Sequence, residues 1–321
     1  MRASLVVICG GVVLGCGSAA PEAEAPVTVA TTVLAVGRGT LEAYGSDRHR
    51  LALALRAEVP RLVLADLEAG VVRELPWPLG PEATCDHVVP AGERVCAAGY
   101  EAGVGCVSAG GDGPPQGIPL EAPPTGLAWA DGALWIATDG GGLWRVVPDG
   151  VPERAAAVRE SMQGLVAGPF GLVWGNGGEG AWRTHVLRRG EETAQWLRPP
   201  LPPNVRCQDE MEVCEWLSRA VGWVHERVWF AASNAPAPLY AWAPQSGEWR
   251  EFHVEGEVQA GPDGVWVVRS DGSVDGYAVS RERFETVVET LAAGEQPVAA
   301  AGGLWVLGAG VLRRLVSASW R

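Results

Sequence analysis

The stretch TGLAWADGALWIATDGGGLWRVVPDG spans Thr125–Gly150. Short apolar runs alternate in it with turns rich in Gly and Asp, a pattern that predicts strand, turn, strand, turn, strand. The second of these strands carries Trp135. No segment of the chain sustains a 3.6-residue apolar period for long, which argues against a helical solenoid.

Four later stretches repeat this pattern, and each places a Trp in its second strand. The Trp residues, counted on from Trp135, follow at steps of 39, 55, 37 and 39 residues and are Trp174, Trp229, Trp266 and Trp305. The 55-residue step is one repeat plus an insertion. Two weaker units begin at Leu41 and Cys85. Seven units of about 40 residues predict a β-propeller of four-stranded blades, or one of six or eight blades if the weak units are misread.

The ends of the chain suggest how the ring closes. The last unit, Gln296–Arg321, has room for three strands, while the β-branched segment Val27–Val36 has no unit of its own. We expect this N-terminal strand to complete the last blade, because closure removes open strand edges. The fold class is therefore predicted as all-β, a seven-bladed propeller of antiparallel four-stranded blades. The repeated Trp side chains should pack blade against blade rather than line a ligand cage.

The first residues have the pattern of an export signal. Arg2 precedes an apolar run of about 10 residues, too short to span a bilayer as a helix and the size of a signal-peptide core. The run ends in Val13-Leu14-Gly15-Cys16, which resembles the lipobox of bacterial lipoproteins. That resemblance implies a signal peptide over 1–15, cleavage before Cys16 and a palmitate-type lipid on Cys16. The alternative is an ordinary secreted protein with a chance Cys at this position.

The following segment, 16–26, is small, Pro-containing and acidic, and we interpret it as a tether from the lipidated Cys16 to a propeller over 27–321. Attachment to the membrane is expected through the lipid alone. Among lipoproteins an Asp after the lipidated Cys favours the inner membrane. Gly17 stands there, so the resemblance implies the cell envelope, at the outer membrane, on its periplasmic or surface side.

Composition narrows the possible partners. Hydrophobic residues make up 47% of the chain, and its formal charge is −13. All 25 basic residues are Arg, so no Lys is present for a phosphate-binding loop or a Schiff base. The missing basic surface argues against nucleic acid as a partner. We expect a monomer.

Five cysteines follow Cys16. The first three are Cys85, Cys96 and Cys106, and their pairing stays open, with one disulfide and one buried thiol favoured. Cys207 and Cys214 close a short loop and are the expected disulfide pair in an oxidising compartment. The spacings lack the paired Cys-x-x-Cys clusters of a zinc site, so no metal is expected.

The repeats resemble known propeller families. Gly132–Val147 is similar to the propeller repeats in the periplasmic sensor regions of hybrid two-component regulators and to those of the virginiamycin B lyase family. Gly264–Val279 is similar to the repeats of the propeller lipoprotein in the outer-membrane barrel-assembly machinery. These resemblances imply a propeller, and a fold of this kind does not by itself imply a function.

Catalytic motifs are missing from the sequence. No two of the five His residues lie within 25 positions of each other, and no G-x-S-x-G elbow or phosphate-binding loop is present. The lyase family uses a His with a Glu, and no such pair maps onto this chain. No catalytic residue and no cofactor is therefore assigned, and an enzyme is less favoured than a binding protein.

One face of the predicted propeller gathers polar residues. In each blade the turn after the second strand shares a face, here called the upper face, with the connections between blades. The insertion near Pro199–Glu215 is acidic and lies in such a connection. Loops on a rigid scaffold commonly bind partners, so the candidate binding residues are Asp139, Asn176, Glu179, Asp209, Glu210, Asn234 and Asp271.

Three functions remain open at this point. The favoured one is a lipid-anchored binding or scaffold module for a protein or glycan partner. The alternatives are an envelope assembly subunit like the barrel-assembly propeller lipoprotein, and a lyase or hydrolase of the virginiamycin B lyase kind.

Overall fold

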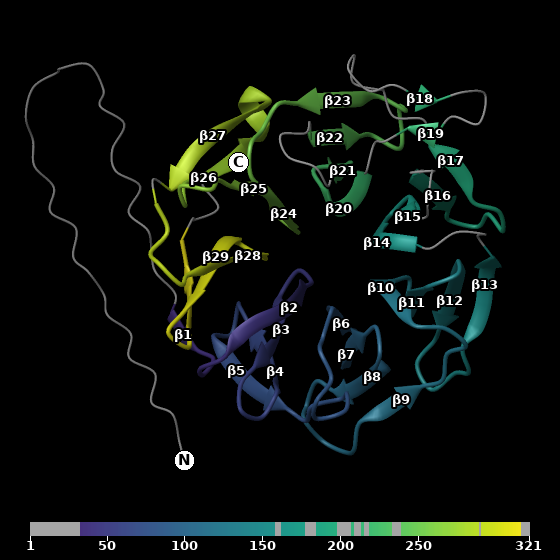
Figure 1. The fold of residues 1–321 in the computed structure, drawn as a ribbon, viewed down its shortest axis with the longest axis vertical. Coiled ribbons are helices and arrows are strands. Elements are labelled where there is room, and N and C mark those ends of the chain that lie inside the picture. Colours follow the sequence, from purple (N-terminus) through teal and green to yellow (C-terminus); the bar gives the residue numbers. More distant parts are fainter. Residues whose placement is uncertain are drawn as a thin grey trace, which may run out of the picture.

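A computed structural model describes residues 33–157, 162–176, 184–197, 207–208, 213–214, 218–232, 239–288 and 290–315. Seven four-stranded antiparallel sheets are arranged around a common axis (Figure 1). The predicted signal peptide, Cys16 and the predicted tether lie outside the described residues. Within the described residues, no helix is long and apolar enough to cross a membrane. The predicted all-β propeller with seven blades is confirmed.

Blades 1 to 3 are formed by the N-terminal half of the chain. Blade 1 comprises β2 (Thr40–Ser46), β3 (Arg50–Arg56), β4 (Arg61–Asp66) and β5 (Val71–Leu75). Blade 2 comprises β6 (His87–Ala91), β7 (Arg94–Gly99), β8 (Gly103–Ser108) and β9 (Gln116–Ile118). Blade 3 comprises β10 (Pro124–Ala130), β11 (Ala133–Thr138), β12 (Gly142–Val146) and β13 (Glu153–Ala157).

The C-terminal half forms the other blades. Blade 4 comprises β14 (Met162–Gly168), β15 (Gly171–Asn176), β16 (Thr184–Arg188) and β17 (Gln195–Leu197), and blade 5 comprises β20 (Ser218–Val224), β21 (Arg227–Ala232), β22 (Leu239–Trp242) and β23 (Trp249–Phe252). Blade 6 comprises β24 (Glu257–Gly261), β25 (Gly264–Val268), β26 (Val274–Ala278) and β27 (Arg283–Val288), with a 3₁₀ turn, η1 (Val279–Arg281), before its last strand. A two-stranded ladder, β18 (Cys207–Gln208) with β19 (Val213–Cys214), lies between blades 4 and 5.

The N-terminal strand closes the ring. Blade 7 consists of β28 (Gln296–Ala300), β29 (Gly303–Gly308), β30 (Val311–Arg314) and, as its fourth strand, β1 (Val33–Ala35). Leu34 of β1 stands opposite Leu312 of β30 and is 3% exposed. Figure 1 shows the purple N-terminal strand beside the yellow C-terminal strands. The predicted closure is confirmed, with the described strand covering the end of the predicted segment.

The repeated Trp residues lie in the second strands, as predicted. Trp305 is 1% exposed and packs with leucines of blade 1, and Trp229 is 0% exposed and packs with blade 6. Each of these rings faces the following blade in the ring. Apolar burial between neighbouring blades is therefore what holds the blades together.

Trp174 faces the opposite side of its blade from the other repeated Trp residues. It is the fourth residue of β15, whereas Trp135, Trp229, Trp266 and Trp305 are each the third residue of their strand. Side chains alternate across a strand, so Trp174 faces the preceding blade and packs with Leu143. Trp174 thus packs blade against blade, as predicted, but toward the opposite neighbour from the other four rings, because a one-residue shift reverses the face.

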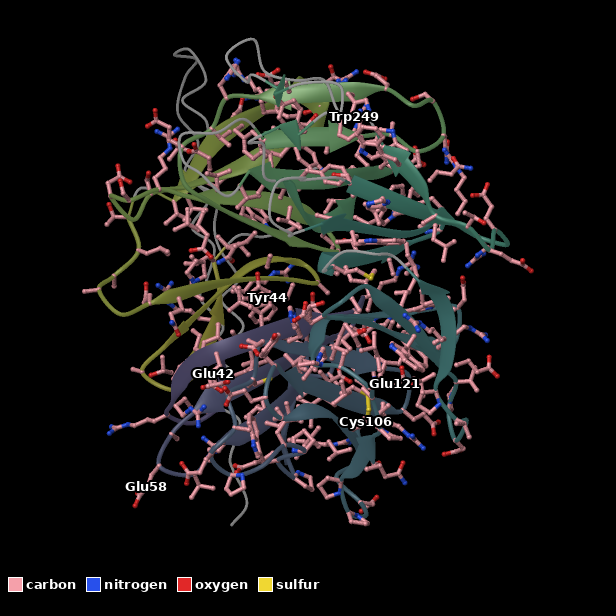
Figure 2. All side chains as sticks on the ribbon, turned by 45° about the vertical axis from the view of Figure 1, so that its right-hand side comes forward. Glu42, Tyr44, Glu58, Cys106, Glu121 and Trp249 are labelled. Carbon is pink, nitrogen blue, oxygen red and sulfur yellow. A yellow bond between two sulfur atoms is a disulfide. The ribbon has the colours of Figure 1, made fainter. Side chains whose placement is uncertain are left out.

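The first group of cysteines contains one disulfide and one buried thiol, as favoured from the sequence. Cys96 and Cys106 stand opposite each other on β7 and β8 and are bonded, with their Cα atoms 4.1 Å apart. Figure 2 labels Cys106, whose sulfur forms the yellow bond. Cys85 is buried between blades 1 and 2, whereas the disulfide lies between blades 2 and 3.

Candidate functional site

The upper face carries two of the predicted binding residues that the structure describes in full. Asp139 and Asp271 each follow the second strand of their blade, at the turns expected. They belong to blades 3 and 6, so two blades separate them. The backbone of Asn176 ends β15, and its side chain lies outside the described residues, as do Glu179, Asp209, Glu210 and Asn234. A shared binding surface for the seven residues stays a prediction.

Asp139 is tied to the neighbouring blade. The hydroxyl of Tyr100, in the corresponding turn of blade 2, donates a hydrogen bond of 2.8 Å to its carboxylate. This hydrogen bond and the nearby negative charge raise the pKa of Tyr100. Tyr100 is 49% exposed, so the pair offers an aromatic ring and a carboxylate to solvent at the boundary of two blades.

Asp271 has a local role in its turn. Its carboxylate accepts hydrogen bonds from the backbone N–H and the hydroxyl of Ser273, at 2.8 and 2.6 Å. These bonds lower the pKa of Asp271. An Asp that bonds to the backbone two residues further on stabilises its own turn.

The insertion between blades 4 and 5 contains a short antiparallel ladder. Cys207 stands directly opposite Cys214 across β18 and β19. Opposite residues of an antiparallel pair have Cα separations of about 4.5–5.5 Å, within the range a disulfide requires. The register thus suits the predicted bond, which stays a prediction.

The described residues hold no group of three or more His, Cys, Asp or Glu side chains that could bind a metal. In the part of the chain that the structure describes, two His side chains lie next to a Glu carboxylate: His49 is 3.1 Å from Glu68, and His253 is 3.5 Å from Glu251. Both His side chains are mainly exposed, at 66% and 87%. Such exposed pairs lack the enclosure that tunes a catalytic acid and base.

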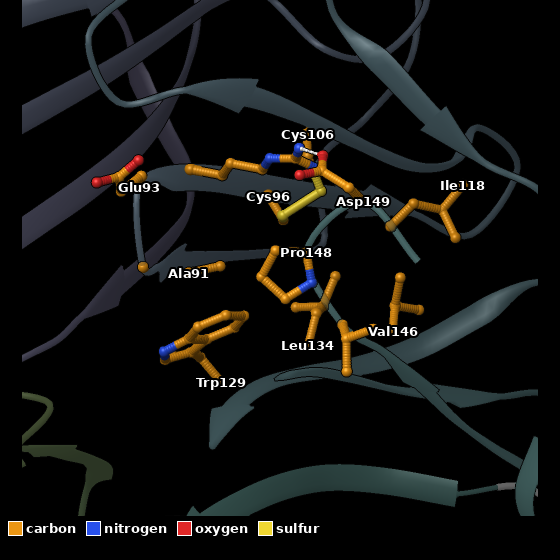
Figure 3. Close-up of a pocket in the computed structure, with 13 residues that line it drawn as sticks. Ala91, Glu93, Cys96, Cys106, Ile118, Trp129, Leu134, Val146, Pro148 and Asp149 are labelled. Atoms are coloured by element: carbon orange, nitrogen blue, oxygen red, sulfur yellow. Dashed lines mark hydrogen bonds and ion pairs between the residues drawn. A yellow bond between two sulfur atoms is a disulfide. The ribbon is translucent and has the colours of Figure 1, made fainter. Parts of the chain in front are cut away.

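The opposite face, here called the lower face, carries a pocket that the sequence analysis missed. This face is formed by the turns between first and second strands and between third and fourth strands. The pocket lies between blades 2 and 3 and has a volume of about 330 Å³ (Figure 3). Sites for small molecules are typically clefts or cavities of about 300–1,000 Å³.

The interior of this pocket is apolar. Its walls include the Cys96–Cys106 disulfide, Trp129, Leu134 and Val146. The turn of blade 2 passes close to the Trp129 ring: Gly92 has φ +64°, and a Cβ there would lie 3.1 Å from Cζ2 of Trp129. Gly92 therefore suits this position for two reasons: it adopts the positive φ without strain, and it leaves room for the ring.

The mouth of the pocket is charged. The guanidinium of Arg94 in blade 2 forms an ion pair with Asp149 in blade 3, which ties the two blades together across the opening (Figure 3). Glu93 is exposed and forms no ion pair among the described residues. Two carboxylates and one guanidinium thus surround the opening.

The sequence contains no signal specific to this pocket. Trp129 lies in a first strand, outside the second-strand position where the repeated Trp residues stand, but Trp223 lies at the same place in blade 5. An aromatic residue at this position therefore does not by itself predict an open pocket. The charged residues at the mouth come from turns that look ordinary in sequence.

No protein-family model matches the chain, and no curated protein matches it. Among solved structures it is similar to a structure of YCF48 bound to D1 peptide, with 15% identity over 89% of this chain and 94% of that chain, TM-score 0.61. It is also similar to a chain of the mitotic checkpoint complex, with 12% identity over 95% and 98%, TM-score 0.61. YCF48 from Cyanidioschyzon merolae follows at 11% identity over 87% and 96%, TM-score 0.60. At these identities the likeness shows the propeller fold alone.

Proposed function

We propose that this chain is a lipid-anchored propeller of the cell envelope that binds a protein partner. The observation that carries the binding role is the open apolar pocket on the lower face, whose lining includes Val147, 37% exposed. Val151, in the same turn, is 79% exposed. Exposed apolar groups next to a pocket with a charged mouth are typical of protein-binding surfaces. The ion pairs and buried rings between blades keep this surface rigid.

Two further points support the proposal. A propeller of similar fold, YCF48, has been solved with a bound peptide, and another similar chain belongs to the mitotic checkpoint complex. The lipobox-like Val13-Leu14-Gly15-Cys16 supports the anchor. Two acyl groups on one Cys suffice for stable membrane attachment.

The anchor is tested by labelling cells with a clickable fatty acid. Wild-type chain should carry the label and fractionate with membranes, and Cys16→Ser should lose both. An unlabelled, soluble wild-type chain would remove the envelope role and favour a secreted protein.

Partner binding is tested by carbodiimide crosslinking in intact cells. This reagent joins carboxylates to amines, and the chain has no Lys, so its side chains enter such adducts only through Asp or Glu. We expect one discrete protein adduct that decreases when purified Cys16→Ser chain is added as competitor. Binding to a glycan array without any protein adduct would contradict the proposal.

A further inference from the structure

The lower-face pocket has a filled counterpart between blades 4 and 5. The strand registers identify corresponding positions in the two places. The first pair is the next-to-last residue of the first strand in each blade. The second pair is the third-strand residue that stands opposite the second-strand partner of the first pair. The third pair is the second residue of the first turn in the preceding blade. These pairs are Trp129 and Trp223, Val146 and Trp242, and Glu93 and Phe170.

An aromatic ring occupies the counterpart. The ring of Phe170 lies 4.8 Å from Trp223 and 6.3 Å from Trp242, measured between centroids. These separations are typical of favourable aromatic pairs. In the open pocket the turn supplies Glu93 and the third strand supplies the smaller Val146, so neither corresponding position gives Trp129 an aromatic neighbour.

The residues that form the walls of the open pocket also correspond to residues around the filled counterpart. Cys96 and Cys106 stand in registers that match Val173 and Val186, and both pairs belong to buried clusters between blades. The molecule itself therefore shows which group fits such a site: an aromatic side chain inserted from outside the blade that carries the Trp.

Charge restricts the occupant further. The carboxylate of Glu93 stands at the mouth with no ionic partner among the described residues, while Asp149 is held by Arg94. The chain as a whole carries a formal charge of −13. A cationic group next to the aromatic ring would be attracted to this mouth, and an anionic one would be repelled.

We propose that the pocket between blades 2 and 3 binds a peptide segment of the protein partner in which an aromatic side chain is adjacent to Lys or Arg. The aromatic ring enters over Trp129, where Phe170 lies in the counterpart, and the basic group pairs with Glu93. This inference rests on the proposed function and specifies the chemistry of its partner.

The test measures binding of three labelled peptides to the full-length chain by fluorescence anisotropy. The peptides differ only in their central pair, Phe-Lys, Phe-Glu or Ala-Lys. We expect Phe-Lys to bind about 10-fold more tightly than Ala-Lys, from the apolar area that the ring buries. Equal binding of all three, or preference for Phe-Glu, would overturn the proposal.

Variants locate the site. Glu93→Lys should weaken Phe-Lys binding, and Glu93→Phe should block it by filling the pocket from within. The matched control is Glu226→Lys, because Glu226 is the exposed second residue of the corresponding turn in blade 5. Carbodiimide should couple the peptide Lys to Glu93, as read by mass spectrometry. Equal loss in Glu93→Lys and Glu226→Lys would show only a general charge effect and would overturn the site.

Failure of this inference and failure of the proposed function are distinguishable. If no peptide binds but the protein adduct in cells persists unchanged in Glu93→Phe, the pocket is excluded and a protein-binding propeller remains. If the adduct is also absent, both are excluded.

Discussion

At the residue scale, buried second-strand Trp residues join neighbouring blades. Trp305 illustrates how: its indole N–H donates to the carbonyl of Ala301 at 3.0 Å, the Arg314 guanidinium lies 5.9 Å from the ring, and the ring packs against blade 1. The apolar surface of the ring is buried, and its single polar atom has a hydrogen-bond partner. The last blade is thereby attached to the first.

Trp305→Ala should lower the free energy of unfolding by about 3–5 kcal/mol, since it removes a buried aromatic side chain and leaves a cavity. Trp305→Phe keeps an aromatic ring and should cost less. Urea unfolding followed by circular dichroism measures both. A cost below about 1 kcal/mol for the Ala variant would show that this ring is not central to blade packing.

The buried Cys85 thiol should make stability sensitive to alkaline pH. Burial, and then the charge of Glu42, raise its pKa from 9.0 to about 12. The folded state therefore keeps its proton where the unfolded state loses it, so stability should fall as pH rises through this interval. Comparing Cys85→Ala with wild type at pH 8 and pH 10.5 isolates the contribution. An identical loss in both proteins would contradict the assignment.

At the element scale, β1 determines whether the ring is closed. Three residues, Val33–Ala35, complete blade 7 and cover the edge of β30. Alternation places Leu34 in the core with Leu51 and Trp305, while Val33 is 52% exposed. An uncovered β30 would present a free edge to other chains.

Leu34→Ala should destabilise the protein by about 2–5 kcal/mol and promote aggregation on heating. Val33→Ala, one residue away in the same strand, is the matched control and should change stability by no more than about 0.5 kcal/mol. Thermal unfolding with light scattering reads both effects. Equal behaviour of the two variants would argue that β1 does not close the ring.

At the scale of the whole molecule, the sequence predicts the architecture well and the binding surface poorly. The spacing of Trp135, Trp266 and Trp305 predicts the blades, because every blade must bury the same kind of face. The spacing does not predict which neighbouring blade Trp174 contacts, since a shift of one residue leaves the spacing almost unchanged and reverses the direction of the side chain. The pocket depends on Arg94 of blade 2 meeting Asp149 of blade 3, and only the packing of the two folded blades brings those turns together.

The upper and lower faces are two alternative binding surfaces for the partner. The sequence points to the upper face with Asp139 and Asp271, and the structure adds the lower-face pocket beside Val147. Exposed valines are available on both sides: Val147 at the pocket is 37% exposed, and Val59, in a turn after a second strand, is 70% exposed. Both side chains can be replaced without disturbing a buried cluster.

The most direct measurement therefore places a photo-crosslinking amino acid at Val147 or at Val59 and irradiates intact cells. A partner that occupies the pocket should give a protein adduct from position 147 and none from position 59. An adduct from position 59 alone would contradict the account and place the partner on the upper face.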